Sequence, residues 1–390
     1  MAGRADPAST FGRVCPARSD PRRLYFHIGW FVGDMDDVRT GLSYGDVLLV
    51  PKRSAVDSRD DVDLSTTLTP TVRLETPLVS AAMDTVTEAP MACELSRAGG
   101  LGVIHRFLTP EEQASQVAEV AAAGERAAAA VGIDEDYVAR AELLVDAGVD
   151  ALVVDVAHGH LERALDAVEA LTEAFPATDL VAGNVATPTG VADLAAAGAD
   201  CVKVGIGPGS HCTTRKVAGA GVPQLTAVDD CASVAADHGV TLCADGGIRN
   251  SGDAVKALLA GADTVMLGSL FAGTDEAPGR VVEVDGTRYK RSRGMATTAA
   301  DEAREDKSND IDADEGVEAL TPYKGPVAGV VEEFCAGIRS GLSYCGGHTV
   351  AEARETAEFV RVAPGAKERE GFHADHDWEG VTVDSGGEAD

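Results

Sequence analysis

The sequence predicts an α/β fold, a (β/α)8 TIM barrel with a long lid insertion after the eighth strand. From about residue 76, short runs that are apolar at nearly every position alternate with alanine-rich amphipathic stretches. Such runs are typical of parallel strands buried on both faces. The pattern Ala-Gly-(Val or Ala)-Asp also recurs at 147–150, 197–200 and 260–263. A glycine there suits a left-handed helix end, so the pattern marks a repeated turn from helix to strand.

The expected elements follow in chain order. Strands are predicted at residues 77–82, 100–105, 127–132, 151–157, 179–185, 201–207, 241–248 and 264–271. Helices are predicted at 110–123, 138–147, 161–175 and 252–259, with a closing helix at 327–340. Eight strands within roughly 200 residues fit a closed barrel better than an open doubly wound sheet. No Gly-x-Gly-x-x-Gly pattern follows the first strand, which argues against a dinucleotide-binding sheet.

Three regions are expected along the chain. Residues 1–34 carry five arginines against three aspartates, unlike the acidic remainder, and are interpreted as a non-native or disordered extension preceding Met35. A genuine basic arm is the alternative. Residues 35–363 are expected to form one catalytic barrel, including a lid at 295–325. A charged stretch at 301–315 is typical of a mobile lid, although a solvated surface loop has the same composition. Residues 364–390 are expected to be an acidic flexible tail.

The net charge narrows the function classes. Acidic residues outnumber basic ones by 64 to 33, a net charge of −31, so a generally basic nucleic-acid-binding surface is excluded. Only 8 of the 33 basic residues are lysine. Many acids with few lysines favour a halophilic source, an archaeon, where salt screens a surface of like charge. An acidic mesophilic protein is the alternative.

Cysteines and hydropathy indicate a reduced, aqueous compartment. The eight cysteines form no Cys-x-x-Cys pair and no cluster with histidine, so a zinc site is not expected. No apolar run reaches the roughly 18 residues of a membrane span, and no signal peptide is evident. A cytoplasmic protein without membrane or nucleic-acid partners is therefore expected, in which an unusual cysteine is reactive rather than structural.

One segment carries the strongest chemical signal. This segment, here called the cysteine loop, comprises residues 205–215 at the end of the sixth strand and has the sequence Gly-Ile-Gly-Pro-Gly-Ser-His-Cys-Thr-Thr-Arg. Its glycines let the backbone approach a ligand or expose carbonyls to a cation. Ser210 can donate to a phosphate, and Cys212 lies at the reactive end of the barrel, where a thiolate is accessible. Thr214 is close enough to relay a proton. A glycine-rich turn with an incidental cysteine is the structural alternative.

Two further loops are expected at the same end of the barrel. Asp245-Gly246-Gly247-Ile248 ends the seventh strand, and Gly268-Ser269 ends the eighth. Phosphate sites built from the loops after strands seven and eight recur in barrels. Asp245 is then placed to accept from ribose hydroxyls, whereas tight turns with an exposed acid are the alternative.

These motifs resemble the IMP dehydrogenase/GMP reductase family. The resemblance rests on the cysteine loop with Val-Pro-Gln at 222–224, on Asp-Gly-Gly-Ile at 245–248, and on Met-Asp-Thr-Val at 83–86, and it extends over residues 40–363. It implies a barrel, usually a homotetramer, that acts at C2 of a purine 5′-monophosphate. Cys212 would be the nucleophile that forms a thioimidate, with Thr214 and Glu315 as a proton relay. A thiolate is a soft nucleophile that can later leave, as this chemistry requires.

The resemblance also implies the binding residues. The substrate would be held by Met83, Ser210, Asp245, Gly247, Gly268, Ser269, Gly294 and Met295. The nicotinamide cofactor would contact Ser58, Arg59, Asp155, Ala157 and Asn184. Potassium or another monovalent cation would be held by the carbonyls of Gly207, Gly209 and Cys212.

Within the family, the sequence favours GMP reductase, which uses NADPH to deaminate GMP to IMP and ammonia. No CBS modules interrupt residues 120–132, and the lid lacks an Arg-Tyr pair, since Arg304 is followed by Glu305. The stretch 155–160 resembles reductases, and Arg59 would meet a neighbouring subunit's NADPH as a bidentate donor. Three features depart from this pattern: residues 81–88 and 99–105 resemble dehydrogenases, Asp312 replaces a reductase arginine, and Ser292 replaces a dehydrogenase tyrosine.

Three alternatives remain. An IMP dehydrogenase without CBS modules would oxidise IMP to XMP with NAD. A nucleotide-binding barrel could have a regulatory duty, although the set of Cys212, Thr214 and Glu315 argues against it. A flavin-binding barrel shares the phosphate site and would give a yellow protein.

Overall fold

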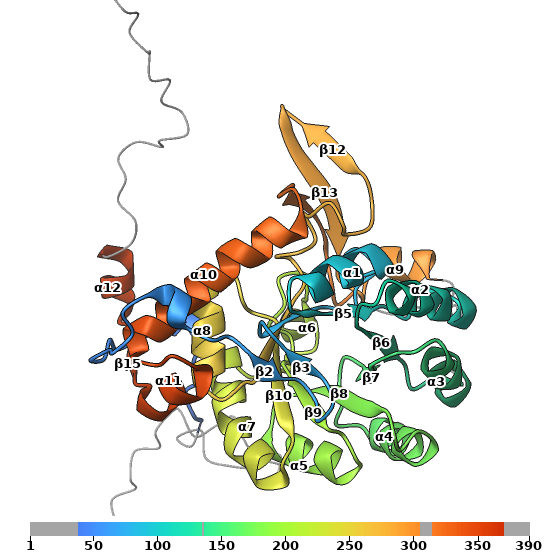
Figure 1. Ribbon diagram of the computed structural model, residues 1–390, viewed down its shortest axis with the longest axis horizontal. Helices are drawn as coiled ribbons and strands as arrows, with labels where there is room; N and C mark the ends of the chain where they lie inside the picture. The colour runs from blue at the N-terminus through green and yellow to red at the C-terminus, as the bar shows by residue number, and fades with distance from the viewer. Residues whose placement is uncertain (1–37, 135, 305–313, 370–390) are drawn as a thin grey trace, which may run out of the picture. The chain divides into compact units, whose positions relative to one another are not determined.

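A closed barrel of eight parallel strands forms the centre of the computed structural model, which describes residues 38–134, 136–304 and 314–369. Around the barrel the order is β10-β11-β4-β5-β6-β7-β8-β9, so each strand lies beside its neighbour in sequence (Figure 1). The strands are β4 (Leu78–Ser80), β5 (Leu101–Ile104), β6 (Ala127–Val131), β7 (Ala151–Asp155), β8 (Asp179–Val185), β9 (Cys201–Val204), β10 (Thr241–Asp245) and β11 (Thr264–Leu267). The predicted TIM barrel is confirmed.

Several strands end earlier than the apolar runs that predicted them. The runs at 201–207, 241–248 and 264–271 leave the barrel after Val204, Asp245 and Leu267. After β10, Gly246 and Gly247 adopt φ values of +89° and +77°, which extended residues do not have. The residues beyond these ends therefore form loops at the carboxyl-terminal face of the barrel, where active sites of this fold lie.

Helices follow the strands and cover the outside of the barrel. They are α1 (Ala89–Arg97), α2 (Pro110–Ala122), α3 (Tyr137–Asp146), α4 (Glu162–Ala174), α5 (Pro188–Ala196), α7 (Gln224–His238), α8 (Ser251–Leu259) and α10 (Val327–Cys345). A short helix, α6 (Thr214–Val217), instead follows the loop at residues 205–213. Thr109 and Glu112 form a capping box that starts α2 beside Pro110. The closing helix α10 runs five residues beyond its predicted end at residue 340.

The repeated Ala-Gly-x-Asp turn does more than end helices. Its glycines, Gly148, Gly198 and Gly261, all have positive φ values, as expected. In each repeat the aspartate carboxylate accepts from a backbone N–H within the first two residues of the neighbouring strand: Asp150 from Ala127, Asp200 from Leu180 and Asp263 from Leu242, at 2.8–2.9 Å. Burial raises the pKa of all three carboxyl groups. The repeat therefore joins adjacent strands at the amino-terminal end of the barrel.

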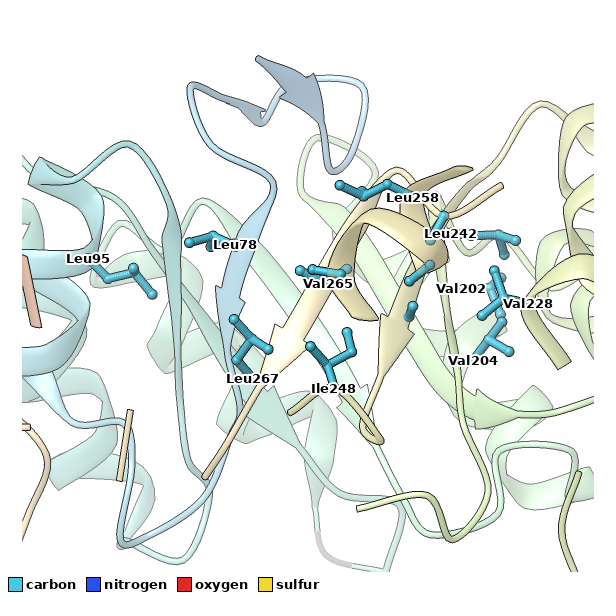
Figure 2. Close-up of a cluster of buried hydrophobic side chains, with 14 of the residues drawn as sticks. Leu78, Leu95, Val202, Val204, Val228, Leu242, Ile248, Leu258, Val265 and Leu267 are labelled. Atoms are coloured by element: carbon cyan, nitrogen blue, oxygen red, sulfur yellow. The ribbon is translucent and has the colours of Figure 1, made fainter. Parts of the chain in front are cut away.

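Apolar packing occurs in two layers. One cluster fills the barrel interior with small side chains such as Ala128, Ala130 and Val153, and includes the buried Cys201 and Cys243. The hairpin of β2 (Thr66–Thr67) and β3 (Arg73–Leu74) contributes Leu68, Val72 and Leu74 to this cluster. The larger cluster lies between strands and helices, where Leu78, Val202 and Leu267 meet Leu95, Val228 and Leu258 (Figure 2). The barrel interior is therefore a packed core and not a pore.

The insertion after β11 contains its own antiparallel sheet. It consists of β12 (Val281–Val284), β13 (Thr287–Arg293) and β14 (Glu318–Pro322), with α9 (Thr298–Ala303) between β13 and β14. The hairpin of β12 and β13 extends away from the barrel (Figure 1). Lys290 is buried beneath it and donates to the carbonyl oxygens of Thr274, Asp275 and Ala277. The insertion is thus anchored at its base by a buried lysine.

The chain ends add short elements. After η3 (Tyr44–Asp46), β1 (Val47–Leu49) pairs antiparallel with β15 (Phe359–Arg361), which follows α11 (Val350–Thr356). The expected tail begins with a short helix, α12 (Pro364–Arg369). The predicted extension at 1–34 and the tail from 370 onward lie outside the described residues. Among the helices of the described chain, none has the length and apolar character needed to cross a bilayer.

Candidate active site

A cavity of about 600 Å³ opens at the carboxyl-terminal ends of the barrel strands. That volume is in the range typical of small-molecule sites. Its wall includes nearly all of the residues that the sequence predicted for catalysis and binding. These are Met83, Asp155, Ala157, Asn184, Gly207, Gly209, Ser210, Cys212, Thr214, Asp245, Gly247, Gly268, Ser269, Gly294, Met295 and Glu315.

The predicted nucleophile and proton relay form one hydrogen-bonded chain. Cys212 Sγ lies 3.1 Å from Thr214 Oγ1, and the Thr214 hydroxyl donates to Glu315 Oε2 at 2.7 Å. A hydroxyl has a single hydrogen, so when Thr214 donates to Glu315 the thiol must be the donor to Thr214. A proton can therefore pass from the Cys212 thiol through Thr214 to the Glu315 carboxylate.

The lid completes this relay by pairing with the cysteine loop. Cys212 and Gly316 form an antiparallel bridge, and the backbone N–H groups of Thr213 and Val317 donate to the carbonyls of Glu315 and His211. The two glycines in this region have a steric role. A Cβ on Gly294 would lie 2.8 Å from the His211 carbonyl oxygen, and one on Gly316 would lie 2.7 Å from Thr297 Cγ2. Backbone segments can approach closely enough to place Glu315 beside Thr214 because these side chains are absent.

Arg215 braces the cysteine loop from beneath. Its guanidinium donates to the carbonyls of Ile206 at 3.2 Å and Val222 at 2.6 Å. Burial lowers its pKa, and the nearby Cys212 opposes this effect. Gly207, with φ +70°, packs against the same side chain, since a Cβ there would lie 2.8 Å from Arg215 Cγ. The sequence analysis assigned no role to Arg215, whose function in the loop is structural.

Lys203 is a site residue that the sequence analysis missed. Its side chain is only 1% exposed inside the barrel, and Nζ donates to Asp155 Oδ1 at 2.5 Å and to Asp245 Oδ2 at 3.1 Å. Burial by itself lowers the pKa of Lys203, but the two carboxylates outweigh it and raise the pKa. Asn184 Nδ2 also donates to Asp245 Oδ2, at 2.8 Å. A single lysine in an otherwise apolar strand was the available signal for this network.

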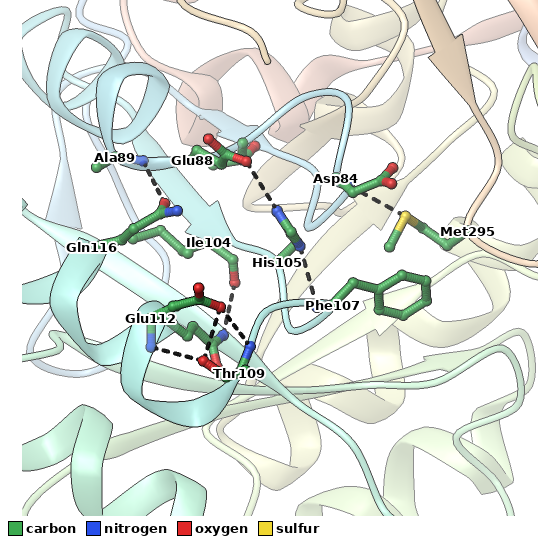
Figure 3. A network of polar contacts seen from close by, with 12 residues as sticks. Asp84, Glu88, Ala89, Ile104, His105, Phe107, Thr109, Glu112, Gln116 and Met295 are labelled. Atoms are coloured by element: carbon green, nitrogen blue, oxygen red, sulfur yellow. Dashed lines mark hydrogen bonds and ion pairs between the residues drawn. The ribbon is translucent and has the colours of Figure 1, made fainter. Parts of the chain in front are cut away.

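On the opposite wall, the first barrel loop contacts the base of the lid. The backbone N–H of Asp84 lies 3.4 Å from Met295 Sδ, and Arg293 Nε donates to Asp84 Oδ2 at 2.8 Å. Figure 3 shows Met295 beside Asp84 at the edge of a polar network around His105. His105 Nδ1 accepts from the backbone N–H of Phe107 at 3.2 Å. These contacts fix Met295 and Phe107 on the cavity wall.

Three arginines that the sequence analysis did not assign to binding also line the cavity: Arg106, Arg249 and Arg304. The guanidinium of Arg304 stacks 4.1 Å above the Phe107 ring and lies 3.6 Å from Asp301. These three guanidinium groups share the wall with the carboxylates of Asp155, Asp245, Asp301 and Glu315. The guanidinium groups can bind an anionic part of a ligand. A cationic cluster cannot be recognised from residues 106, 249 and 304, which are far apart in sequence.

The histidine beside the nucleophile belongs to a chain of hydroxyl groups. His211 Nδ1 lies 3.1 Å from Ser210 Oγ, and Nε2 lies 2.8 Å from Ser292 Oγ. Ser292 Oγ in turn lies 2.7 Å from Thr321 Oγ1. Burial lowers the pKa of the His211 imidazole. The chain connects the cavity to the sheet of the insertion.

Two predicted cofactor residues do not lie at this cavity. Ser58 and Arg59 are exposed and belong to the start of η4 (Arg59–Asp61), where Ser58 caps the helix by accepting from Asp60 N–H. Asp312, which was noted in place of a reductase arginine, lies outside the described residues.

Comparison with known proteins agrees with this geometry. The family model described as "IMP dehydrogenase / GMP reductase domain" matches residues 41–373. The chain is 38% identical to an inosine-5′-monophosphate dehydrogenase of Nitrosopumilus maritimus, with 84% of this chain and 97% of the relative covered. It is 35% identical to a GMP reductase of Leishmania donovani, with 88% and 98% covered. A crystal structure of a cysteine-to-alanine variant of Trypanosoma brucei GMP reductase with guanosine 5′-monophosphate superposes with a TM-score of 0.83 at 33% identity, covering 87% of this chain and 99% of that one.

The alignment lengths show whether the absence of CBS modules separates a reductase from a dehydrogenase. The alignments to the dehydrogenase and to the Leishmania reductase span 461 and 485 positions, more than the 390 residues of this chain. Relatives of both kinds therefore contain chain that has no counterpart here. The absence of an inserted segment at residues 120–132 does not separate a reductase from a dehydrogenase.

Proposed function

The chain belongs to the IMP dehydrogenase / GMP reductase family of purine nucleotide oxidoreductases, and within it we propose that this protein is a GMP reductase. The reaction is the NADPH-dependent deamination of GMP to IMP and ammonia. The observation that carries the proposal is the hydrogen-bonded chain from Cys212 through Thr214 to Glu315. An amino leaving group must depart protonated, and this chain ends on a carboxyl group that can supply the proton.

The substrate is a purine 5′-monophosphate held across the cavity. Ser210, Gly247, Gly268 and Ser269 lie on the loops proposed to bind phosphate and ribose. Lys203 and Asn184 both bond to Oδ2 of Asp245, so Oδ1 is left to accept from a ribose hydroxyl. Met83, Gly294 and Met295 would line the base.

Four bond changes at C2 of the purine, in two successive substitutions, account for the reaction. Sγ of Cys212 adds to C2 as its proton passes to Thr214, and the amino group leaves as ammonia, which gives a thioimidate. NADPH, when bound, supplies the hydride that C2 then accepts. The C–S bond breaks, IMP is released, and the Cys212 thiolate is regenerated and reprotonated. Thr214 and Glu315 move the protons in both halves.

The cofactor would lie beside Asp155, Ala157 and Asn184, which line the cavity. Lys203 fixes the carboxylate of Asp155, so this acceptor is already oriented for a ligand hydroxyl. Ser58 and Arg59 are exposed and lie outside their own chain's cavity, which suits a contribution to a neighbouring subunit's cofactor. This arrangement, together with exposed valines on β12, supports a homotetramer.

Potassium or another monovalent cation is proposed to bind the main-chain oxygens of Gly207, Gly209 and Cys212. The Gly209 carbonyl accepts from the Cys212 N–H at 3.1 Å, which leaves its second lone pair for a cation. The loop thus fits such an ion, which would stabilise the backbone conformation that presents Cys212.

A second candidate is IMP dehydrogenase, and one observation favours it. Glu305 and not a tyrosine follows Arg304, yet the Arg304 side chain lies on the cavity wall over Phe107. A lid arginine in that position is available to a thioimidate that reacts with water. In that case IMP is oxidised to XMP with NAD.

Direct assay in high potassium chloride separates the two directions. The protein is incubated with GMP plus NADPH, and separately with IMP plus NAD, while the absorbance of the reduced cofactor is followed. Consumption of NADPH only in the first mixture supports the reductase, and production of NADH only in the second overturns it. Replacing NADPH with NADH in the first mixture measures the cofactor preference.

The matched control is Cys212→Ala. This variant should lose either activity while still binding purine nucleotide, because the side-chain partner of Sγ is Thr214, which is not among the residues proposed to bind the nucleotide. Turnover retained by Cys212→Ala would rule out the assigned nucleophile.

A further inference from the structure

The side chain of His211, which directly precedes the nucleophile in the cysteine loop, has no role in the proposed chemistry. It is only 8% exposed, yet both ring nitrogens have a hydroxyl partner: Ser210 at Nδ1 and Ser292 at Nε2. Ser292 and Thr321 are themselves buried, on β13 and β14. Hydrogen bonds thus connect Ser210, His211, Ser292 and Thr321 in one row. The last two residues belong to the insertion, about 80 to 110 residues later in the sequence than His211.

With a neutral imidazole, the hydrogen bonds that connect Ser210, His211, Ser292 and Thr321 can all be donated in one direction along the row or all in the other. Each hydroxyl has one hydrogen, and a neutral imidazole has one donor and one acceptor nitrogen. If Ser210 donates to Nδ1, its hydrogen points away from any ligand in the cavity. If instead Nδ1–H donates to Ser210, then Ser292 donates to Nε2, Thr321 donates to Ser292, and the Ser210 hydrogen is released toward the cavity.

An anion in the cavity selects the second direction. A phosphate oxygen accepts hydrogen bonds and offers none when ionised, so Ser210 can bind it only as a donor. A serine hydroxyl that already accepts from an imidazole N–H is a stronger donor, because hydrogen bonds in a chain polarise one another. Ser292 and Thr321 lie on neighbouring strands, and their hydroxyl groups can supply the donors that this direction requires.

We propose that His211 is a positioning residue that turns the Ser210 hydroxyl toward the 5′-phosphate of the nucleotide and so contributes to recognition of the phosphate. This inference rests on the proposed function, which places the phosphate at Ser210. Ser292 and Thr321 fix the orientation of His211 from the sheet of the insertion. The phosphate subsite is thereby coupled to the same insertion that supplies Glu315.

Two substitutions of His211 distinguish a role in orienting the Ser210 hydroxyl from a role in packing alone. His211→Leu removes both ring nitrogens and keeps an apolar group of similar size. His211→Asn keeps an amide N–H near the position of Nδ1 and so can still donate to Ser210. Isothermal titration with GMP and IMP, and with guanosine and inosine, measures the contribution of the phosphate independently of the direction of catalysis.

We expect His211→Leu to weaken binding of both nucleotides about tenfold or more, the effect of one hydrogen bond to a charged group. Binding of the nucleosides, which lack the phosphate, should be unchanged, and His211→Asn should recover most of the lost nucleotide affinity. Equal nucleotide affinity in His211→Leu and the parent protein would overturn the inference. Equal loss for nucleosides and nucleotides would also overturn it, because His211 would then support the whole cavity.

A second pair of variants addresses the case in which His211→Leu does not fold. Ser292→Ala and Thr321→Val leave the imidazole in place and remove the hydroxyls that orient it. Each should weaken nucleotide binding relative to the parent protein and spare nucleoside binding, and unchanged nucleotide affinity in both would overturn the inference. If neither nucleotide binds the parent protein, the proposed function fails and this inference fails with it.

Discussion

The Thr214 hydroxyl lies 2.7 Å from Oε2 of Glu315, a residue 101 positions later in the chain. The contact exists because the segment after α9 pairs with the cysteine loop through the bridge between Cys212 and Gly316. The lid insertion is therefore part of the catalytic machinery proposed here. This relay and three other features of the chain can each be tested.

Glu315→Gln should reduce turnover about 100-fold or more, which is the usual contribution of a positioned acid or base. Glutamine keeps the side-chain volume and can still accept from Thr214, but it cannot take up or release the proton. The measurement is kcat and KM for the active direction, with KM for the nucleotide expected to change little. Glu318→Gln, at an exposed position on β14, is the matched control. Full activity in Glu315→Gln would remove this residue from the relay.

Lys203→Met should destabilise the protein by about 3 kcal/mol, because removal of one partner of a buried ion pair leaves the others unpaired. Here Asp155 and Asp245 would face each other without the ammonium group between them. Urea unfolding with and without nucleotide measures the change. Lys216→Met, on the exposed surface of α6, should alter stability by less than about 0.5 kcal/mol. Similar midpoints for the two variants would contradict the role given to Lys203.

Asp263→Asn should change how stability depends on pH. Burial raises the pKa of Asp263, opposed by the N–H of Leu242 and by Arg354, so the folded protein binds its proton more tightly than the unfolded chain. Stability must then fall as pH rises from the unfolded pKa, about 3.9, through the raised folded pKa. Asparagine still accepts from Leu242 but does not ionise, so the variant should lack this fall.

Thermal unfolding at several pH values between about 4 and 8 tests this point. The variant should gain stability relative to the parent protein by about 1.4 kcal/mol for each unit by which the pKa is raised. Asp263→Ala, which also loses the acceptor, should be less stable than Asp263→Asn at every pH. Parallel curves for Asp263→Asn and the parent would exclude the proposed proton linkage.

Salt should stabilise the protein strongly. With a net charge of −31, the acidic surface repels itself, and the screening length falls from about 10 Å at 0.1 M salt to about 3 Å at 1 M. The melting temperature should therefore rise by a similar amount in potassium, sodium and choline chloride. Activity should in addition require potassium or a similar ion if the carbonyls of Gly207 and Gly209 hold a cation. A melting temperature that is independent of salt would contradict the halophilic interpretation.

Several features could be predicted from the sequence because they have local causes. The apolar runs predicted all eight barrel strands, and the Ala-Gly-x-Asp repeat predicted glycines with positive φ at residues 148, 198 and 261. The strand ends at Val204, Asp245 and Leu267 were predicted too late, because Ile206, Ile248 and Phe271 are as apolar as strand residues. Their side chains pack against the core from loops, which a hydropathy pattern does not distinguish from a strand.

The sequence by itself determined the barrel, the cysteine loop and the family, because strand periodicity, glycine conformations and a contiguous motif are encoded within a few residues. Only the tertiary structure decided which charged groups meet. It paired Lys203 with Asp155 and Asp245, placed Arg304 over Phe107, and linked Ser210 through His211 to Ser292. These partners lie far apart in the chain, and closure of the barrel and pairing of the insertion bring them together. The physical reason is that burial makes such contacts strong, and burial is a property of the folded chain.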